Sequence, residues 1–117
     1  MKVLVDTSIW IDHINAANSE LIDLLERRLV LIHSTVIGEL ACGNFKNRQQ
    51  RMGDFKLLAR ASEATDDEVL EMIEFRKLYG KGLSWVDAQL LASAALSAAA
   101  LWTADKNLRK LAAEIAY

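Results

Sequence analysis

Apolar residues along the chain fall into short continuous runs separated by longer stretches of helical periodicity. The runs Lys2 to Val5, Leu29 to Ile32 and Ala99 to Thr103 have the length and composition typical of buried strands. Hydroxyl-bearing residues follow the first two runs, at Thr7-Ser8 and Ser34-Thr35, and such residues cap helices. We therefore expect each of these runs to lead into a helix.

Helical spacing predicts helices between and after the strands. They cover about Ile9 to Ile14, Ser19 to Leu25, Val36 to Ala41, Phe55 to Ala59, Glu68 to Tyr79, Ser84 to Ser97 and Lys106 to Ala116. A polar segment from Asn44 to Arg51 precedes the fourth of them. Asp66 is the expected cap of the helix from Glu68, and Gly80-Lys81-Gly82 its expected stop. Strands alternating with helices predict an α/β fold with a parallel sheet.

The composition excludes some classes of protein and leaves the predicted α/β fold unchanged. A chain of 117 residues with 52% hydrophobic and 26% charged residues is expected to form one globular domain over residues 1–117. No apolar stretch reaches the roughly 18 residues of a membrane span, and no signal-peptide pattern opens the chain. We expect a cytoplasmic protein that does not enter a membrane. The single cysteine, Cys42, is expected to be a small buried residue.

Four acidic residues stand where an apolar run gives way to a helix, or within a helix's first turns: Asp6, Glu39, Asp87 and Asp105. In a parallel sheet, ligands bind beyond the carboxyl ends of the strands. Two carboxylates about 4 Å apart repel by roughly 4 kcal/mol at an effective dielectric near 20, so a cluster either takes up protons or binds cations. Oxygen ligands favour Mg²⁺ or Mn²⁺. The placement predicts one acidic metal pocket at this sheet edge.

Each acid also has a purely structural interpretation. An Asp before a helix is a preferred N-cap, which applies to Asp6 and Asp105. The segment from Ser84 to Asp87 matches a capping box. Glu39 lies inside an apolar helix, close to the face expected to be buried, where an acid needs a partner. Four acids at matching positions nevertheless favour the metal site over four unrelated caps.

Other polar and aromatic residues keep two interpretations open. Hydroxyl and amide groups near the sheet edge could orient the acids or metal-bound water, or be ordinary cap residues; they are Thr7, Ser8, Thr103 and Asn107. Three basic residues could contact RNA phosphates, or form a solvated helix face; they are Lys46, Arg48 and Arg51. Trp10, Trp85 and Trp102 could stack on bases, although core packing is the favoured role. The formal net charge of −2 argues against binding to nucleic acid by bulk electrostatics but does not exclude a nuclease.

These motifs resemble those of the PIN-domain ribonucleases, and most closely the VapC toxins of bacterial toxin–antitoxin pairs. The matching stretches are Val3 to Trp10, Gly38 to Leu40, Ser84 to Ala88 and Thr103 to Leu108. Each stretch is a weak signal alone, but the four occur in the family's order and spacing over essentially the whole chain. One departure is Asn107, because many relatives carry a second acid at that position.

The resemblance implies a three-layer α/β/α domain in which Asp6, Glu39, Asp87 and Asp105 bind one or two divalent cations and cut RNA. Ser8 and Thr103 become supporting hydroxyls. The resemblance further implies a cognate VapB-like antitoxin that places a basic side chain in the acidic pocket, and a homodimer. A guanidinium pairs with carboxylates in a bidentate way, so it would compete with the metal.

For phosphodiester hydrolysis, an acid-bound Mg²⁺ or Mn²⁺ would lower the pKa of its water and so provide the nucleophile. One alternative is a phosphotransfer enzyme with an aspartyl nucleophile after the first strand, but Ser8 stands where its second acid is expected. Another is a catalytically inactive PIN-fold module that binds RNA or protein. The glycines form no phosphate-binding loop, which argues against a nucleotide-binding enzyme.

Overall fold

A computed structural model describes residues 1–115, whose strands form one parallel sheet. The strands are β1 (Val3–Val5), β2 (Val30–Ile32), β3 (Ala59–Arg60) and β4 (Ala100–Trp102), in the spatial order β3-β2-β1-β4. Val3 of β1 pairs with Val30 of β2 on one side and with Ala100 of β4 on the other. The predicted α/β fold with a parallel sheet is confirmed.

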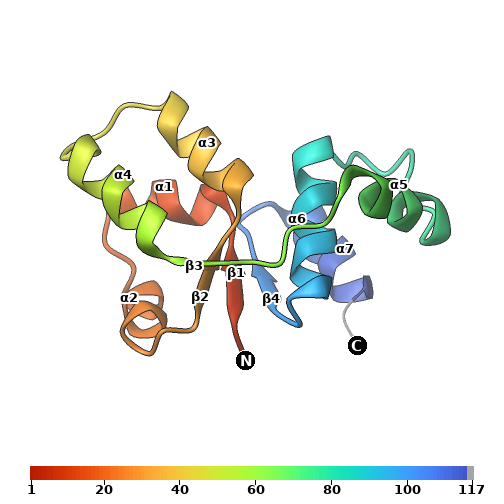
Figure 1. Cartoon of the computed structure of the whole chain (residues 1–117), viewed down its shortest axis with the longest axis horizontal. Coiled ribbons are helices and arrows are strands. Elements are labelled where there is room, and N and C mark those ends of the chain that lie inside the picture. The colour runs from red at the N-terminus through yellow and green to blue at the C-terminus, as the bar shows by residue number, and fades with distance from the viewer. Residues whose placement is uncertain (116–117) are drawn as a thin grey trace.

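Helices flank the sheet on both sides (Figure 1). They are α1 (Thr7–Asn15), α2 (Ser19–Glu26), α3 (Ser34–Cys42), α4 (Arg48–Leu57), α5 (Asp66–Phe75), α6 (Trp85–Leu96) and α7 (Lys106–Ile115). Helices α1 to α4 lie to one side and α5 to α7 to the other, which is the predicted three-layer α/β/α arrangement. Within residues 1–115, no helix has both the length and the hydropathy that a membrane span needs.

The order of the strands places a topological switch point between β1 and β4. The chain runs outward from β1 through β2 to β3, and then crosses to the opposite edge to form β4. Ligands of open α/β sheets bind at such a point, beyond the carboxyl ends of the strands. Asp6 directly follows β1, and Thr103 directly follows β4. The fold therefore brings these two residues to the edge where ligands are expected.

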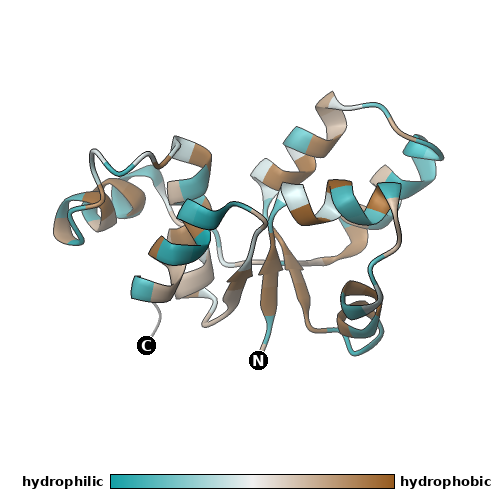
Figure 2. Cartoon of the chain, turned by 180° about the vertical axis from the view of Figure 1, so that it is seen from behind, coloured by the Kyte–Doolittle hydropathy of each residue, from teal (hydrophilic) through white to brown (hydrophobic). Residues whose placement is uncertain are grey.

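The core lies around the central strands, which are hydrophobic over most of their length (Figure 2). Leu4, Val5 and Ile32 of β1 and β2 are fully buried, as is Leu90 from the middle of α6. Burying one such side chain contributes about 1.5–3 kcal/mol relative to leaving it exposed. The strand β4 differs, because Ala100 is exposed and the other two residues are half-buried. Its predicted burial is incomplete because β4 is an edge strand.

One predicted helix has different bounds, and the end of another is not tested. The helix expected from Phe55 to Ala59 begins earlier, at Arg48, so it includes part of the polar segment, and Ala59 belongs to β3. Strand β3 escapes prediction because it has two residues, both exposed at an edge. The helix expected to reach Ala116 is α7, and its predicted end lies outside the described residues.

The cap and stop of α5 were also wrongly assigned. Its N-cap is Thr65 rather than Asp66, in a capping box with Glu68. The helix ends at Phe75, before the Gly80-Lys81-Gly82 segment, because Lys77 adopts a left-handed conformation with a φ of 54°. The amide of Leu78 then donates to the carbonyl of Ile73, a closing bond that usually has glycine at the left-handed position.

Two side chains expected in the core are exposed. Cys42 is the last residue of α3 and is exposed rather than buried. Trp85 is the first residue of α6 and remains 42% exposed. Trp10, in contrast, is 3% exposed and packs edge-on against Phe55, as predicted for a core residue.

Candidate active site

Asp6 forms the centre of the candidate site. It is the N-cap of α1, is only 9% exposed, and accepts three hydrogen bonds. Its Oδ1 accepts from the backbone amide of Thr7 at 2.7 Å, and its Oδ2 accepts from the hydroxyls of Ser8 at 3.2 Å and Thr103 at 2.7 Å. A carboxylate has about four lone-pair positions. Three donors therefore hold the group in one orientation and leave it able to accept one more ligand.

Hydroxyl groups tie the segment after β1 to the segment after β4. Thr103 Oγ1, which donates to Asp6, also accepts from the backbone amide of Asp105 at 3.1 Å. Ser8 Oγ accepts from the amide of Ala104 at 3.1 Å. Because β1 and β4 are paired neighbours, these bonds join residues far apart in sequence. Ser8 and Thr103, the two hydroxyls predicted to support the acids, both contact Asp6.

Asp105 begins α7. Its Oδ1 accepts from the amide of Leu108 at 2.9 Å, which is the bond of an N-cap. Asp105 itself is exposed, so its other oxygen is accessible to solvent or a ligand. The amide of Asn107 points elsewhere, since its Nδ2 donates to the carbonyl of Lys81 at 2.9 Å. Asn107 thus ties α7 to the loop before α6.

Glu39 lies on α3 and was expected close to a buried face, but the residue is exposed. It does have a buried partner, because Thr7 Oγ1 donates to its Oε1 at 2.7 Å. Thr7 also donates its backbone amide to Asp6. Thr7 and Thr103 therefore connect three of the four predicted acids, Glu39, Asp6 and Asp105, through direct hydrogen bonds.

Asp87 lies on another element and, within residues 1–115, makes no side-chain hydrogen bond to the other three acids. It lies in the first turn of α6, a helix that contacts β1, and is half-buried. The predicted capping box is confirmed: the amide of Asp87 donates to Ser84 Oγ at 3.1 Å, and its Oδ2 accepts from the amide of Ser84 at 3.4 Å. Asp87 can cap α6 and also bind a ligand, because the cap uses only one of its two carboxylate oxygens.

The predicted acidic metal pocket is not a closed ligand set in this structure. Within residues 1–115, no three acidic, histidine or cysteine side chains lie close enough together to hold one ion. Mutual repulsion of uncompensated carboxylates favours such separation. The donor chemistry nevertheless fits a hard divalent cation, because all four predicted ligands offer carboxylate oxygens and Asp6 is already oriented.

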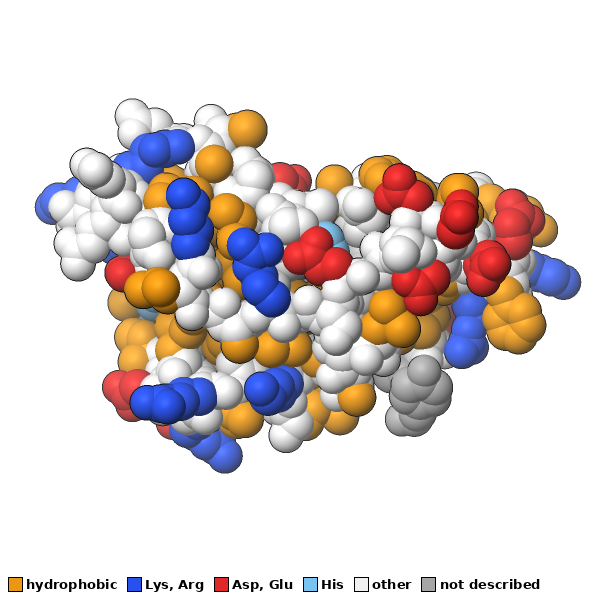
Figure 3. Space-filling model, in the orientation of Figure 1, with side chains coloured by type: hydrophobic (Ala, Val, Ile, Leu, Met, Phe, Trp, Pro, Cys, Tyr) orange, Lys and Arg blue, Asp and Glu red, His pale blue; other side chains and the backbone are white. Residues whose placement is uncertain are grey.

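Charge is distributed unevenly over the molecule (Figure 3). Lys and Arg side chains gather over the half that carries α2 and α4, and Asp and Glu gather over α5. Of the three predicted phosphate contacts, Lys46 is exposed, and Arg51 is half-buried against a cavity that also includes His13. Arg48 has a structural role, because its guanidinium donates to the carbonyls of Gly43 and Ala41 at the end of α3.

A polar cluster that the sequence did not reveal holds the start of α3. His33 is 3% exposed and caps the helix through its Nδ1, which accepts from the amide of Thr35 at 3.0 Å. Its Nε2 lies 3.8 Å from Glu63 Oε1, and Ser34 donates to Glu63 through both its amide and its hydroxyl. An acid in a loop carries no sequence signal for a contact with residues so distant in sequence.

Burial has the largest effect on the pKa of His33 and lowers it below its usual value. The charge of Glu63 acts to raise this pKa, and the charge of Arg60 acts to lower it. For Glu63, burial acts to raise the pKa, but the bonds from Ser34 and the nearby positive charge hold it below its usual value. Both groups therefore bind protons more weakly in the fold than in the unfolded chain. Their contribution to stability is present above their unfolded pKa values and is lost as pH falls through the folded ones.

We expect the thermal midpoint of the protein to decrease as pH is lowered from 7.5 to 5, beginning below the unfolded histidine pKa of about 6.5. His33→Asn keeps a good N-cap but removes the titrating imidazole. The decrease between pH 7 and pH 5.5 should therefore be smaller in this variant, as measured by circular dichroism. An equal decrease in both proteins would show that His33 does not cause it.

Thr103→Val should test the link between Asp6 and Asp105. Thr103 is 1% exposed, and valine has nearly the same shape but no hydroxyl. Loss of the donor to Asp6 and the acceptor for the Asp105 amide should cost about 1–3 kcal/mol in the free energy of unfolding. If Asp6 binds metal, loss of its orienting partner should also lower RNA cleavage about 10–100-fold. Thr103→Ser, which retains the hydroxyl, should restore both; restoration of neither would contradict this role.

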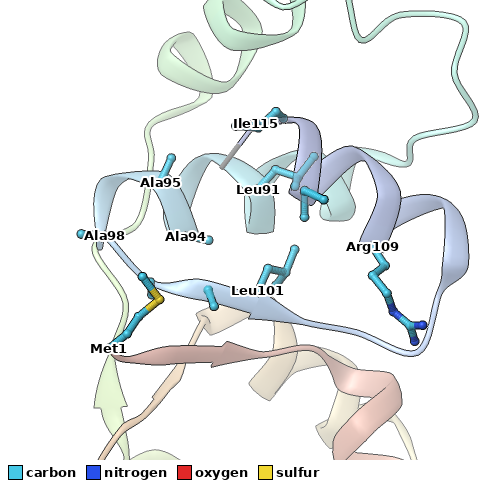
Figure 4. Close-up of a pocket in the computed structure, with 12 residues that line it drawn as sticks. Met1, Leu91, Ala94, Ala95, Ala98, Leu101, Arg109 and Ile115 are labelled. Carbon is cyan, nitrogen blue, oxygen red and sulfur yellow. The ribbon is translucent and has the colours of Figure 1, made fainter. Parts of the chain in front are cut away.

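One cavity lies away from these acids. It has a volume of about 410 Å³ between β4, α6 and α7, and alanine and leucine side chains form most of its lining (Figure 4). Arg109 lies at one end and donates to the carbonyl of Thr103 at 3.2 Å. No acidic residue lines the cavity. Its chemistry therefore suits apolar contact rather than metal binding.

Comparison with known proteins identifies the fold and its relatives. The family model of the PIN domain matches residues 3–114. A protein named Ribonuclease VapC32, from Mycobacterium tuberculosis strain CDC 1551, is 44% identical over 113 residues, which cover 96% of this chain and 91% of that protein. The Ribonuclease VapC32 of strain H37Rv has the same identity and coverage.

Proposed function

The chain belongs to the PIN domain family, and from this membership we propose that it is a metal-dependent endoribonuclease acting as the toxin of a toxin–antitoxin pair. The relatives named Ribonuclease VapC32 support this activity. One structural observation supports the position of the active site. Asp6 accepts hydrogen bonds from Thr103 and Thr7. Thr103 also accepts from the backbone amide of Asp105, and Thr7 also donates to Glu39. Asp87 on α6 completes the proposed acid set.

In the proposed mechanism, Asp6, Glu39, Asp87 and Asp105 hold the metal. When bound, Mg²⁺ or Mn²⁺ supplies a Lewis acid that activates water and stabilises charge on the phosphate. Thr103 and Ser8 keep the Asp6 carboxylate oriented. Lys46 and Arg51 would provide positive charge for RNA phosphates. Arg48, which lies between them in sequence, instead holds the end of α3. Resemblance to the family implies that in-line attack by water expels the 3′-oxygen, which would leave a 5′-phosphate and a 3′-hydroxyl.

The proposed antitoxin would cover α1 and α2. Ile11 of α1 is 48% exposed and Ile22 of α2 is 38% exposed, so apolar surface remains available on both helices. A basic side chain of the antitoxin placed among the acids would compete with the metal for the carboxylates. Such a basic side chain would inhibit the nuclease by competing with its metal, without any change of fold.

We also include self-association in the proposal. Leu70 and Phe75 of α5 and Leu96 of α6 are exposed, and they line a shared groove of about 980 Å³. Apolar side chains that gather on a surface typically mark an interaction site. Light scattering should give a mass of two chains, and a monomer at micromolar concentration would contradict this part of the proposal.

Expression and cleavage test the function directly. Induced expression should arrest bacterial growth, and co-expression with the proposed antitoxin should restore growth and yield a stable complex with suppressed nuclease activity. The purified free chain should cleave end-labelled RNA in Mg²⁺ and leave products with 5′-phosphates. A folded chain that neither cleaves RNA nor arrests growth would favour the alternative of an inactive binding module.

A further inference from the structure

Two exposed aromatic side chains lie around the start of α6, the helix that carries Asp87. Trp85 is 42% exposed and Tyr79 is 59% exposed. Both line a cavity of about 200 Å³ whose remaining wall includes Leu78, Leu83 and Ala88. Large aromatic rings normally contribute to a core, as Trp10 does here, so their exposure around one hollow requires a different explanation.

A direct contact joins this cavity to one of the four acids, Asp87. Ser84, which lines it, donates its backbone amide to Asp87 Oδ2 at 3.4 Å. Trp85 is the first residue of α6, two positions before Asp87. A group seated against Trp85 would therefore lie next to the turn that carries one of the four acids.

The loop that forms the cavity is held in place. Gly80 and Gly82 have φ values of 74° and 76°, a region in which other residues are strained. Between them, the carbonyl of Lys81 accepts from Asn107 Nδ2 at 2.9 Å. Asn107 belongs to α7, which begins directly after Asp105. The same loop thus contacts the elements that carry Asp87 and Asp105.

We propose that this cavity, formed by Tyr79, the Gly80–Gly82 turn and Trp85, binds one base of single-stranded RNA beside the scissile phosphate. The inference deepens the proposed function and rests on it. Apolar walls and aromatic rings suit the face of a base, since every base can stack on a ring whatever its sequence. Lys81 is exposed on the same loop and supplies positive charge for the adjacent phosphate.

Binding of a short labelled RNA, measured by fluorescence anisotropy in Mg²⁺, tests the proposal. All variants are made in the Asp6→Asn background, so that the RNA stays intact. Trp85→Leu keeps an apolar side chain but removes the ring, and it should raise the Kd roughly fivefold to a hundredfold. Trp85→Phe, which keeps a ring, should retain most of the affinity. Leu57→Ala removes an 85% exposed apolar side chain on α4 and should leave the Kd unchanged.

RNAs that each lack the base at a single position test the same contact by changing the ligand instead of the protein. One abasic position should weaken binding to the Trp85 protein and have little further effect on Trp85→Leu. An unchanged Kd in Trp85→Leu would overturn the inference. The inference would also be overturned if Trp85→Leu changed the mass measured by light scattering but not the RNA affinity. Trp85 would then serve contact between copies of the chain.

The outcomes separate this inference from the proposed function. If the protein with Asp6 intact fails to cleave RNA but Trp85 governs binding, the base site stands and the nuclease proposal fails. If that protein cleaves RNA and Trp85→Leu binds normally, the nuclease proposal stands and the base site fails.

Discussion

Asp6→Asn should reduce the rate of RNA cleavage by roughly a hundredfold or more while leaving the fold intact. The substitution removes the negative charge at the one carboxylate that three donors already orient, and electrostatic groups placed at a reacting centre typically contribute 10²–10³-fold. Asparagine is as good an N-cap as aspartate, so α1 should keep its cap. The Thr103 hydroxyl can rotate to accept from the new amide.

The control for this experiment is Asp12→Asn, because Asp12 is an exposed acid on the same helix. Initial rates on end-labelled RNA and thermal melts should be measured on both variants. Asp12→Asn should cleave at the wild-type rate. Cleavage by Asp6→Asn at the wild-type rate, with an unchanged melt, would show that Asp6 is only a helix cap.

Removal of divalent cations should abolish cleavage by the wild-type protein. A chelator in excess should reduce the rate at least as far as Asp6→Asn does, because carboxylates without a cation cannot supply the Lewis acid that activates water and stabilises the phosphate charge. Addition of Mg²⁺ or Mn²⁺ beyond the chelator should restore the rate, since both prefer oxygen ligands. A metal-independent ribonuclease in the same buffers controls for effects on the RNA. Undiminished cleavage in the chelator would contradict the metal mechanism.

The strands β1 and β2 and the start of α6 could be predicted because their signals are local. Apolar runs mark β1 and β2, and the capping box of Ser84 and Asp87 marks the start of α6. Helix ends were harder to predict. Arg28, Lys77 and Ala98 take left-handed conformations just after α2, α5 and α6, where glycine is the usual signal. None of the three residue types indicates such an end.

The edge of the sheet where Asp6 and Asp105 follow β1 and β4 was predictable, but the hydrogen bonds there were not. A parallel sheet brings the residues after its strands together whatever their distance in sequence. The bond from Thr103 to Asp6 depends on the register of β1 against β4, which pairs Val5 with Trp102. That register emerges only in the folded chain. The exposure of Glu39 and Trp85 likewise depends on which neighbours cover α3 and α6.

The most direct test of the account is to locate a bound cation by its effect on nearby nuclei. Paramagnetic Mn²⁺, added at substoichiometric amounts to ¹⁵N-labelled protein, broadens the amide signals of residues close to it. The account predicts selective loss of the signals of Thr7, Asp87 and Asp105 in the wild-type protein, and no such loss in Asp6→Asn. Broadening centred instead on the acidic first turn of α5, at Asp66, Asp67 and Glu68, or broadening that Asp6→Asn leaves unchanged, would contradict it.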